Sequence, residues 1–125
     1  MSTKGVLERE PLSSRARGEA RAWVAQRVSA AVLALCVLVH LVTMIVAVRN
    51  GLSADAILDR TRGNLAWAAF YSVFVLAVGV HAPLGLRVVA AEWLQWRGRS
   101  ADIACVAIGL ALIALGARAV AAVAL

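Results

Sequence analysis

Charge, proline and aromatic side chains are scarce in this chain, and long stretches carry no charge at all. It contains two prolines, two cysteines and seven acidic residues, whereas 62% of its 125 residues are hydrophobic. A soluble domain of this size rarely exceeds about half apolar residues. The lack of charge over long runs therefore excludes an ordinary soluble domain and predicts a protein that crosses a membrane more than once.

Other absences narrow the function. Cys36 and Cys105 lie inside apolar runs without metal-type spacing, so we interpret both as small buried hydrophobes. Segments of alternating polarity at strand length are missing, which argues against a membrane barrel. The sequence shows no nucleophile–base arrangement, phosphate loop or metal-hydrolase motif, so we do not expect the chain to be catalytic alone. The net charge of +6 lies in the first 27 residues and between apolar runs, and this pattern argues against nucleic acid as a partner.

Three apolar runs are long enough to cross a lipid bilayer. Val28–Val48 and Gly63–Leu86 contain no Lys, Arg, Asp or Glu, and the run from Ile103 to the end contains Arg118 alone. A transmembrane helix needs roughly 20 apolar residues, and a helix satisfies its own backbone in lipid.

We therefore predict an all-α fold, an integral membrane bundle of three transmembrane helices. The helices are expected near residues 23–48, 64–92 and 102–124. Residues 1–22 are expected to form a basic cytoplasmic tail, and residues 23–125 the membrane anchor domain.

The positive residues predict an orientation. They are concentrated in the tail and in the loop between the second and third runs, whereas Asp55 and Asp59 dilute them in the first loop. Because Lys and Arg accumulate on the cytoplasmic side, the N-terminus is predicted to be cytoplasmic and the C-terminus outside. The expected location is the bacterial inner (cytoplasmic) membrane, as a multi-pass protein in the lipid bilayer.

The two histidines, His40 and His81, both fall inside predicted spans. An ionisable side chain inside the membrane costs free energy, so we treat both histidines as candidates for a functional role. Four roles are open for a histidine of this kind: a neutral helix contact, a proton relay, a quinone contact or an axial haem ligand.

The neighbours of His81 favour haem. Gly85 follows four residues later on the same helix face, where a flat macrocycle needs room beside its ligand. Arg87 lies about 9 Å further along the axis, where it can pair with a propionate or act as a plain positive-inside anchor. Pro83 removes a backbone hydrogen bond and is expected to kink the helix.

The two histidines are predicted to lie at different depths. His40 is about 20 Å from the cytoplasmic end of its helix, and His81 is about 9 Å from the same side. Two axial ligands of one iron need nearly the same depth. We therefore expect the partner ligand of His81 on another chain, with His40 spare or bound to a second haem nearer the outer face.

Two segments carry a resemblance to a known family. "QRVSAAV", Gln26–Val32, resembles a His-Arg-hydrophobic-Ser-Gly signature at the start of the first span. "HAPLGLRVVAAEW", His81–Trp93, resembles the pattern His-x3-Gly-x-Arg-His-x3-Asp. With the three-helix plan, the chain resembles the cytochrome b membrane anchors of succinate dehydrogenase and fumarate reductase (respiratory complex II).

The resemblance implies roles for single residues. His81 matches the axial ligand of haem b, and Arg27 matches an arginine beside the quinone pocket and a haem propionate. Ser29 matches the motif serine near that pocket. Trp23 stands where the family has a quinone-binding serine, and we expect it to stack on the ring of ubiquinone or menaquinone. His40 corresponds in helix and depth to the second haem ligand of some members of the wider superfamily.

The sequence also departs from the family pattern within the two motifs. Gln26 replaces the histidine before the first arginine, Val88 replaces the histidine after the second, and Glu92 replaces the aspartate. We therefore expect the affinity for quinone, or the type of quinone, to differ from those of the family.

The resemblance implies a haem b-binding anchor subunit that passes electrons between an iron–sulfur subunit and membrane quinone. Its partners would be a flavoprotein subunit, the iron–sulfur subunit and either a second membrane anchor or another copy of itself. Two alternatives stay open. One is a small transporter or proton-conducting protein that uses His40 and His81, and the other is a haem-free structural anchor.

Overall fold

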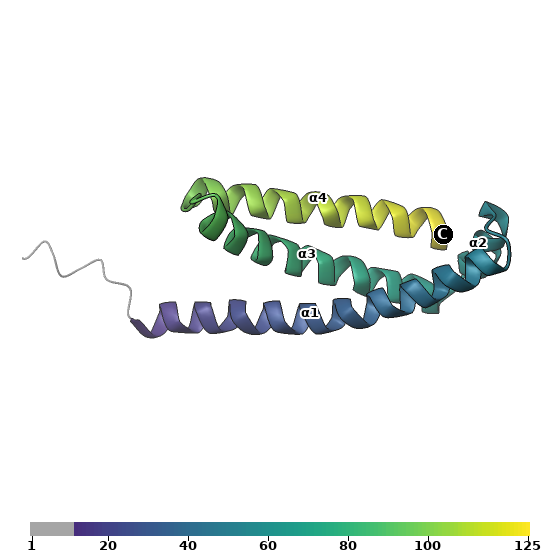
Figure 1. The fold of residues 1–125 in the computed structure, drawn as a ribbon, viewed down its shortest axis with the longest axis horizontal. Coiled ribbons are helices and arrows are strands. Elements are labelled where there is room, and N and C mark those ends of the chain that lie inside the picture. Colours follow the sequence, from purple (N-terminus) through teal and green to yellow (C-terminus); the bar gives the residue numbers. More distant parts are fainter. Residues whose placement is uncertain (1–11) are drawn as a thin grey trace, which may run out of the picture.

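The computed structural model describes residues 12–125, which form four helices and no strand (Figure 1). These are α1 (Leu12–Arg49), α2 (Ala54–Thr61), α3 (Leu65–Trp93) and α4 (Arg99–Ala124). Three of them, α1, α3 and α4, are long and apolar enough to cross a membrane. The predicted all-α fold with three transmembrane helices is therefore confirmed. The first eleven residues of the predicted tail lie outside the described part of the chain.

Helix α1 begins well before its predicted membrane span. It starts at Leu12, whereas the sequence placed the start of the span near Trp23. Charged residues end a membrane span but do not end a helix, and the Arg, Ala and Glu residues of this segment favour helix. Its 38 residues measure about 57 Å at 1.5 Å per residue, well beyond the roughly 30 Å of hydrocarbon. The N-terminal part of α1 therefore projects from the membrane as a helix.

The short helix α2 follows the first span and was not predicted. Ser53 caps its start, because its side-chain oxygen accepts a hydrogen bond from the backbone N–H of Ala56 at 3.2 Å. At its end the buried Thr61 hydroxyl lies 2.6 Å from the carbonyl oxygen of Val123 and donates to it. This hydrogen bond fastens α2 to the end of α4.

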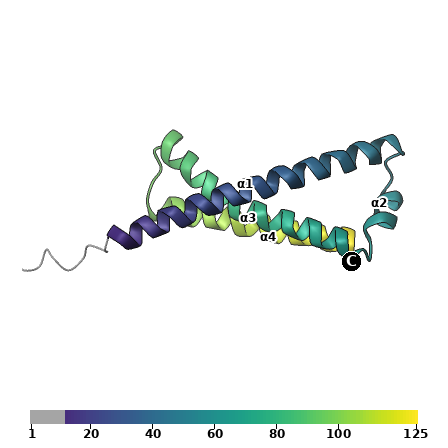
Figure 2. The same cartoon turned by 90° about the horizontal axis from the view of Figure 1, so that it is seen from below.

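Helices α3 and α4 lie side by side along their lengths (Figures 1 and 2). Glycines make the close approach possible. A Cβ atom on Gly109 would lie 2.6 Å from Cγ of Pro83, and one on Gly79 would overlap Ile113. Small residues let transmembrane helices pack closely where apolar surface alone gives no driving force. The ring of Pro83, a residue that the sequence predicted to kink the helix, therefore packs against Gly109.

Helix α1 packs against α3 and then diverges. Figure 2 shows its C-terminal half moving away from α3 and α4, with α2 bridging the distance back to the start of α3. Cys36 of α1 and Cys105 of α4 are buried free cysteines, as predicted. Ser29 and Cys36, the buried residues of α1, both lie near the middle of this helix, before it diverges.

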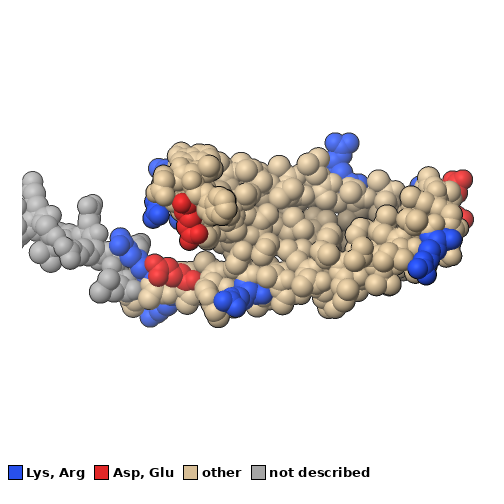
Figure 3. All heavy atoms as spheres, in the orientation of Figure 1, with Lys and Arg blue, Asp and Glu red and all other residues tan. Residues whose placement is uncertain are grey.

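Charged side chains gather at the two ends of the molecule, and the long middle is mostly uncharged (Figure 3). The beginning of α1 and the turn between α3 and α4 lie at one end, and α2 and the C-terminus lie at the other (Figure 1). The two segments predicted to be cytoplasmic therefore share one end. Which end faces the cytoplasm stays a prediction.

Candidate functional site

His81 meets Ser29 where α1 and α3 pack together. The Nδ1 atom of the half-buried His81 ring lies 3.4 Å from Oγ of the buried Ser29. The same Oγ donates to the backbone carbonyl of Gln26 at 3.1 Å. When the single hydroxyl proton of Ser29 is donated to the Gln26 carbonyl, the proton of the histidine lies on Nδ1, which donates to Oγ. The lone pair on Nε2 is then free, which is the form of histidine that binds a metal.

Gly85 lies one turn further along α3 and faces Gln26. A Cβ atom at Gly85 would lie 3.3 Å from Nε2 of Gln26, so the glycine leaves room for that side chain. The Oε1 atom of Gln26 is buried and has no hydrogen-bond partner among residues 12–125. Sequence reasoning treated Gln26 as a departure from the motif and missed its position in the site. Its position directly before Arg27, a predicted site residue, could have indicated that Gln26 belongs to the site.

Arg27 and Trp23 form a separate pair on α1. The Arg27 guanidinium lies 4.9 Å from the centre of the Trp23 ring, a cation–π contact between exposed side chains. Residues two positions apart differ by about 200° around a helix. Arg27 therefore faces away from the buried Ser29, and within this chain the three predicted quinone residues do not line one pocket.

Arg87 is engaged by a residue that the sequence did not single out. Its Nε atom lies 2.8 Å from Oδ1 of Asp102, in an ion pair between two partly exposed side chains. The pair connects the end of α3 to the start of α4. Contact between Arg87 and a haem propionate stays a prediction. A propionate at this position would share the Arg87 guanidinium with Asp102.

His40 occupies a different part of the bundle. Its ring centre lies 6.0 Å from that of Tyr71 and 6.1 Å from that of Phe74, both on α3. Its Nδ1 atom is buried without a hydrogen-bond partner in the described part of the chain. His40 is eleven positions along α1 from Ser29, the contact of His81, and this distance is about 16 Å. The two histidines therefore do not converge on one site.

The described residues contain no group of three or more His, Cys, Asp or Glu side chains that could together hold a metal ion. Each of the two histidines could therefore supply only one ligand to a metal at its position. A histidine binds haem iron through an imidazole nitrogen that has a free lone pair. His81, with its Nδ1 proton held by Ser29, fits one axial position of such an iron.

Comparison with known proteins identifies one family. The family model described as "Succinate dehydrogenase/Fumarate reductase transmembrane subunit" matches residues 7–117, which is most of the chain. Neither the search of curated proteins nor the search of solved structures found a match.

Proposed function

Because the chain belongs to the transmembrane-subunit family of succinate dehydrogenases and fumarate reductases, we propose that it is the haem b-binding anchor of such a complex. It would hold a flavoprotein subunit and an iron–sulfur subunit on the bacterial cytoplasmic membrane. Electrons would pass between the iron–sulfur subunit and membrane ubiquinone or menaquinone. The chain supplies ligands and a low-dielectric surrounding, and the redox chemistry belongs to the cofactors.

The observation that carries this proposal is the contact between His81 and Ser29. Donation from Nδ1 to a fixed oxygen sets the ring orientation, selects the tautomer and raises the basicity of Nε2. Ser29 is itself oriented by the Gln26 carbonyl. Haem b, when bound, supplies a one-electron carrier between the iron–sulfur subunit and quinone.

The second axial ligand is proposed to come from another chain. His40 is about 16 Å from the level of Ser29 and His81, so it does not reach the same iron. The exposed surface of α1 beside the site, which includes Val24 and Val28, leaves space for a partner helix. The partner would be a second membrane anchor or another copy of this chain.

Arg27 and Trp23 are proposed to contribute to the quinone site from the face that meets the partner. A guanidinium there favours negative charge that develops on a quinone oxygen. Ser29 would act on the haem side, through His81, and not as a direct quinone contact. This assignment separates two residues that the resemblance had placed in one pocket.

The helical extension of α1 before Arg27 is proposed to contact the soluble subunits. It leaves the membrane at the end that also contains the turn between α3 and α4 (Figure 1). Its basic residues, Arg15, Arg17 and Arg21, precede the span directly. Together, the extension and the turn would form the docking surface on the cytoplasmic face.

The structure gives no support to a proton-conducting path between the histidines. On α1 the ten residues between Ser29 and His40 are Ala, Val, Leu and Cys, and on α3 the six residues between Phe74 and His81 are Val, Leu, Ala and Gly. A proton relay needs closely spaced polar groups or water, and these two segments contain no polar side chain. The haem-free anchor is the remaining alternative, which a spectrum decides.

Co-purification tests the proposed assembly. A tag on the full-length chain is expected to recover a flavin-containing subunit and an iron–sulfur subunit from detergent-solubilised membranes, with succinate- or fumarate-linked quinone activity. A matched preparation from cells that lack the tagged chain controls for soluble subunits that bind the resin. Recovery of the chain without any flavin or iron–sulfur subunit would contradict the proposal.

A further inference from the structure

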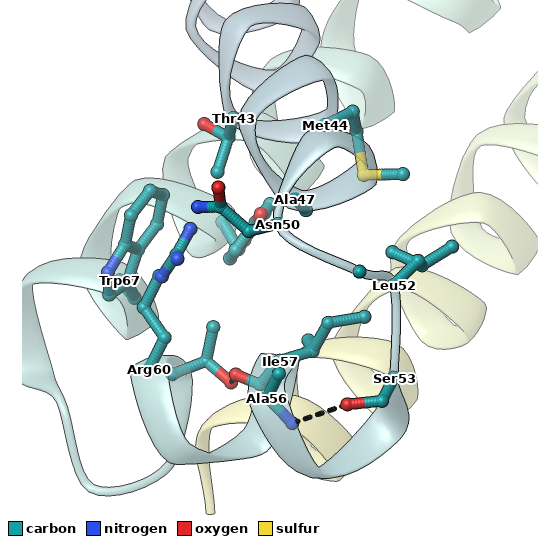
Figure 4. Close-up of a pocket in the computed structure, with 13 residues that line it drawn as sticks. Thr43, Met44, Ala47, Asn50, Leu52, Ser53, Ala56, Ile57, Arg60 and Trp67 are labelled. Atoms are coloured by element: carbon teal, nitrogen blue, oxygen red, sulfur yellow. Dashed lines mark hydrogen bonds between the residues drawn. The ribbon is translucent and has the colours of Figure 1, made fainter.

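A small cavity, lined by apolar side chains and a few polar ones, lies at the opposite end of the molecule from the first turns of α1. It is enclosed by the end of α1, by α2 and by the start of α3, and has a volume of about 80 Å³ (Figure 4). This volume corresponds to roughly five water-sized positions. Polar side chains from all three helices line it, among them Thr43, Asn50, Arg60 and Tyr71. The cavity can hold a compact polar group.

Arg60 is the charged residue of this cavity. Figure 4 shows its side chain extending from α2 between Trp67 and Asn50. Among residues 12–125 the Arg60 side chain has no ion pair and no hydrogen bond, although Asp59 is its neighbour in sequence. A guanidinium is suited to bidentate pairing with phosphate or carboxylate. The cavity therefore presents an unpaired anion-binding group.

An apolar groove continues from the same point. It shares Thr43, Arg60 and Trp67 with the cavity and is otherwise lined by Leu38, Val39, Val42 and Val46 of α1. Val46 and Leu38 are eight positions apart, which is about 12 Å along the helix. The groove thus runs from the charged end of the molecule toward its uncharged middle. An acyl chain of a membrane lipid extends in the same direction, from the headgroup into the hydrocarbon.

We propose that this cavity and groove bind one anionic phospholipid, with its phosphate on Arg60 and an acyl chain along Val46, Val42 and Leu38. Arg60 follows a transmembrane span, which places it at the level of lipid phosphates. The first loop carries three arginines against two aspartates, so its net charge favours an anionic over a zwitterionic headgroup. A free anion would make no use of the groove. The site is distinct from that of His81 and does not depend on its haem.

Lipid titration tests the proposal. The complex is purified through the full-length chain, stripped of lipid in detergent and titrated with phosphatidylglycerol, phosphatidylcholine or inorganic phosphate in native mass spectrometry. Arg60→Gln is expected to weaken phosphatidylglycerol binding about tenfold, the worth of one charge-assisted contact. Arg62→Gln removes the same charge outside the cavity and is expected to change it less than about twofold.

The groove has its own variants. Val42→Trp fills the groove and is expected to weaken phosphatidylglycerol as Arg60→Gln does, whereas Leu41→Trp on a neighbouring exposed position leaves binding unchanged. Equal losses in Arg60→Gln and Arg62→Gln, or unchanged binding in Val42→Trp, would overturn the proposal. So would displacement of the lipid by millimolar inorganic phosphate, which would assign a simple anion site, or the absence of any binding because a partner subunit covers the groove.

Discussion

At His81, the proposed binding of haem iron depends on which ring nitrogen carries the proton. The Ser29 hydroxyl, held by the Gln26 carbonyl, accepts from Nδ1 and leaves Nε2 free. The sequence identified His81, Gly85 and Ser29 through their motifs, because each has a fixed spacing. It did not predict that Ser29 and His81 touch, since they are 52 positions apart and only packing brings them together. The same holds for Arg87 and Asp102.

Removal of the Ser29 hydroxyl should change the haem without removing it. In Ser29→Ala the Nδ1–H of His81 loses its acceptor, so Nε2 becomes a weaker donor to iron and the reduced state is favoured. The midpoint potential of the haem is expected to rise by up to roughly 60 mV, which is a factor of ten for a one-electron couple. Redox titration of the optical spectrum measures it. Ser72→Ala, which deletes an exposed hydroxyl on α3, should leave the potential unchanged, and a downward shift in Ser29→Ala would contradict the role of Ser29.

At the scale of elements, the contact between α3 and α4 is set by glycines and a proline. The spans were predictable from uncharged length alone, and their ends agree with α3 and α4 within a few residues. The start of α1 was not predictable in this way, because hydropathy shows where a chain leaves the lipid and does not show where its helix begins. Helix α2 was missed because eight residues with three charges give no membrane signal. Ser53, a residue favoured at helix N-caps, was the available indication.

Gly109→Ala tests the packing of α3 on α4. The added methyl group would meet the rigid ring of Pro83 and the carbonyl oxygen of Gly79, at 2.6 and 3.3 Å. The two helices would have to separate, at a cost of about 1–3 kcal/mol. Thermal unfolding in detergent measures the loss. Gly18→Ala, where nothing lies within 4 Å of the new atom, is the matched control and should be neutral or slightly stabilising; equal melting temperatures for both variants would refute the packing role.

The attachment of α2 to α4 can be tested with an isosteric change. Thr61→Val keeps the shape of the buried side chain but removes the hydrogen bond to the Val123 carbonyl. We expect a loss of about 1–2 kcal/mol and faster proteolysis within the first loop. Thr43→Val removes a hydroxyl that donates within its own helix and should have a smaller effect. Unchanged proteolysis of the loop in Thr61→Val would argue that the hydrogen bond does not hold α2.

At the scale of the whole molecule, the three long helices form an open bundle. Helix α1 diverges from α3 and α4 (Figure 2), and much of its apolar surface stays exposed. The depth difference between His40 and His81 was predictable, because helical rise converts sequence distance into depth. The divergence of α1 was not, since it depends on side-chain packing and not on the length of any span.

The predicted orientation can be tested by cysteine labelling in intact cells. Both native cysteines are buried, so a new exposed cysteine dominates the signal. Asp55→Cys in α2 is expected to react with a membrane-impermeant maleimide before lysis, whereas Glu92→Cys near the other end should react only after permeabilisation. The reverse pattern would place the N-terminus outside and remove the basis for cytoplasmic docking of the soluble subunits.

The most direct test of the account is the reduced-minus-oxidised optical spectrum of the purified complex, compared with His81→Ala and His40→Ala. The wild-type complex should show a low-spin haem b band. The His81→Ala variant should lose that band while its flavin and iron–sulfur subunits still co-purify, and His40→Ala should keep it. A wild-type complex that retains flavin and iron–sulfur subunits without haem, or a His81→Ala complex with an unchanged low-spin band, would contradict the assignment of His81 as an axial ligand.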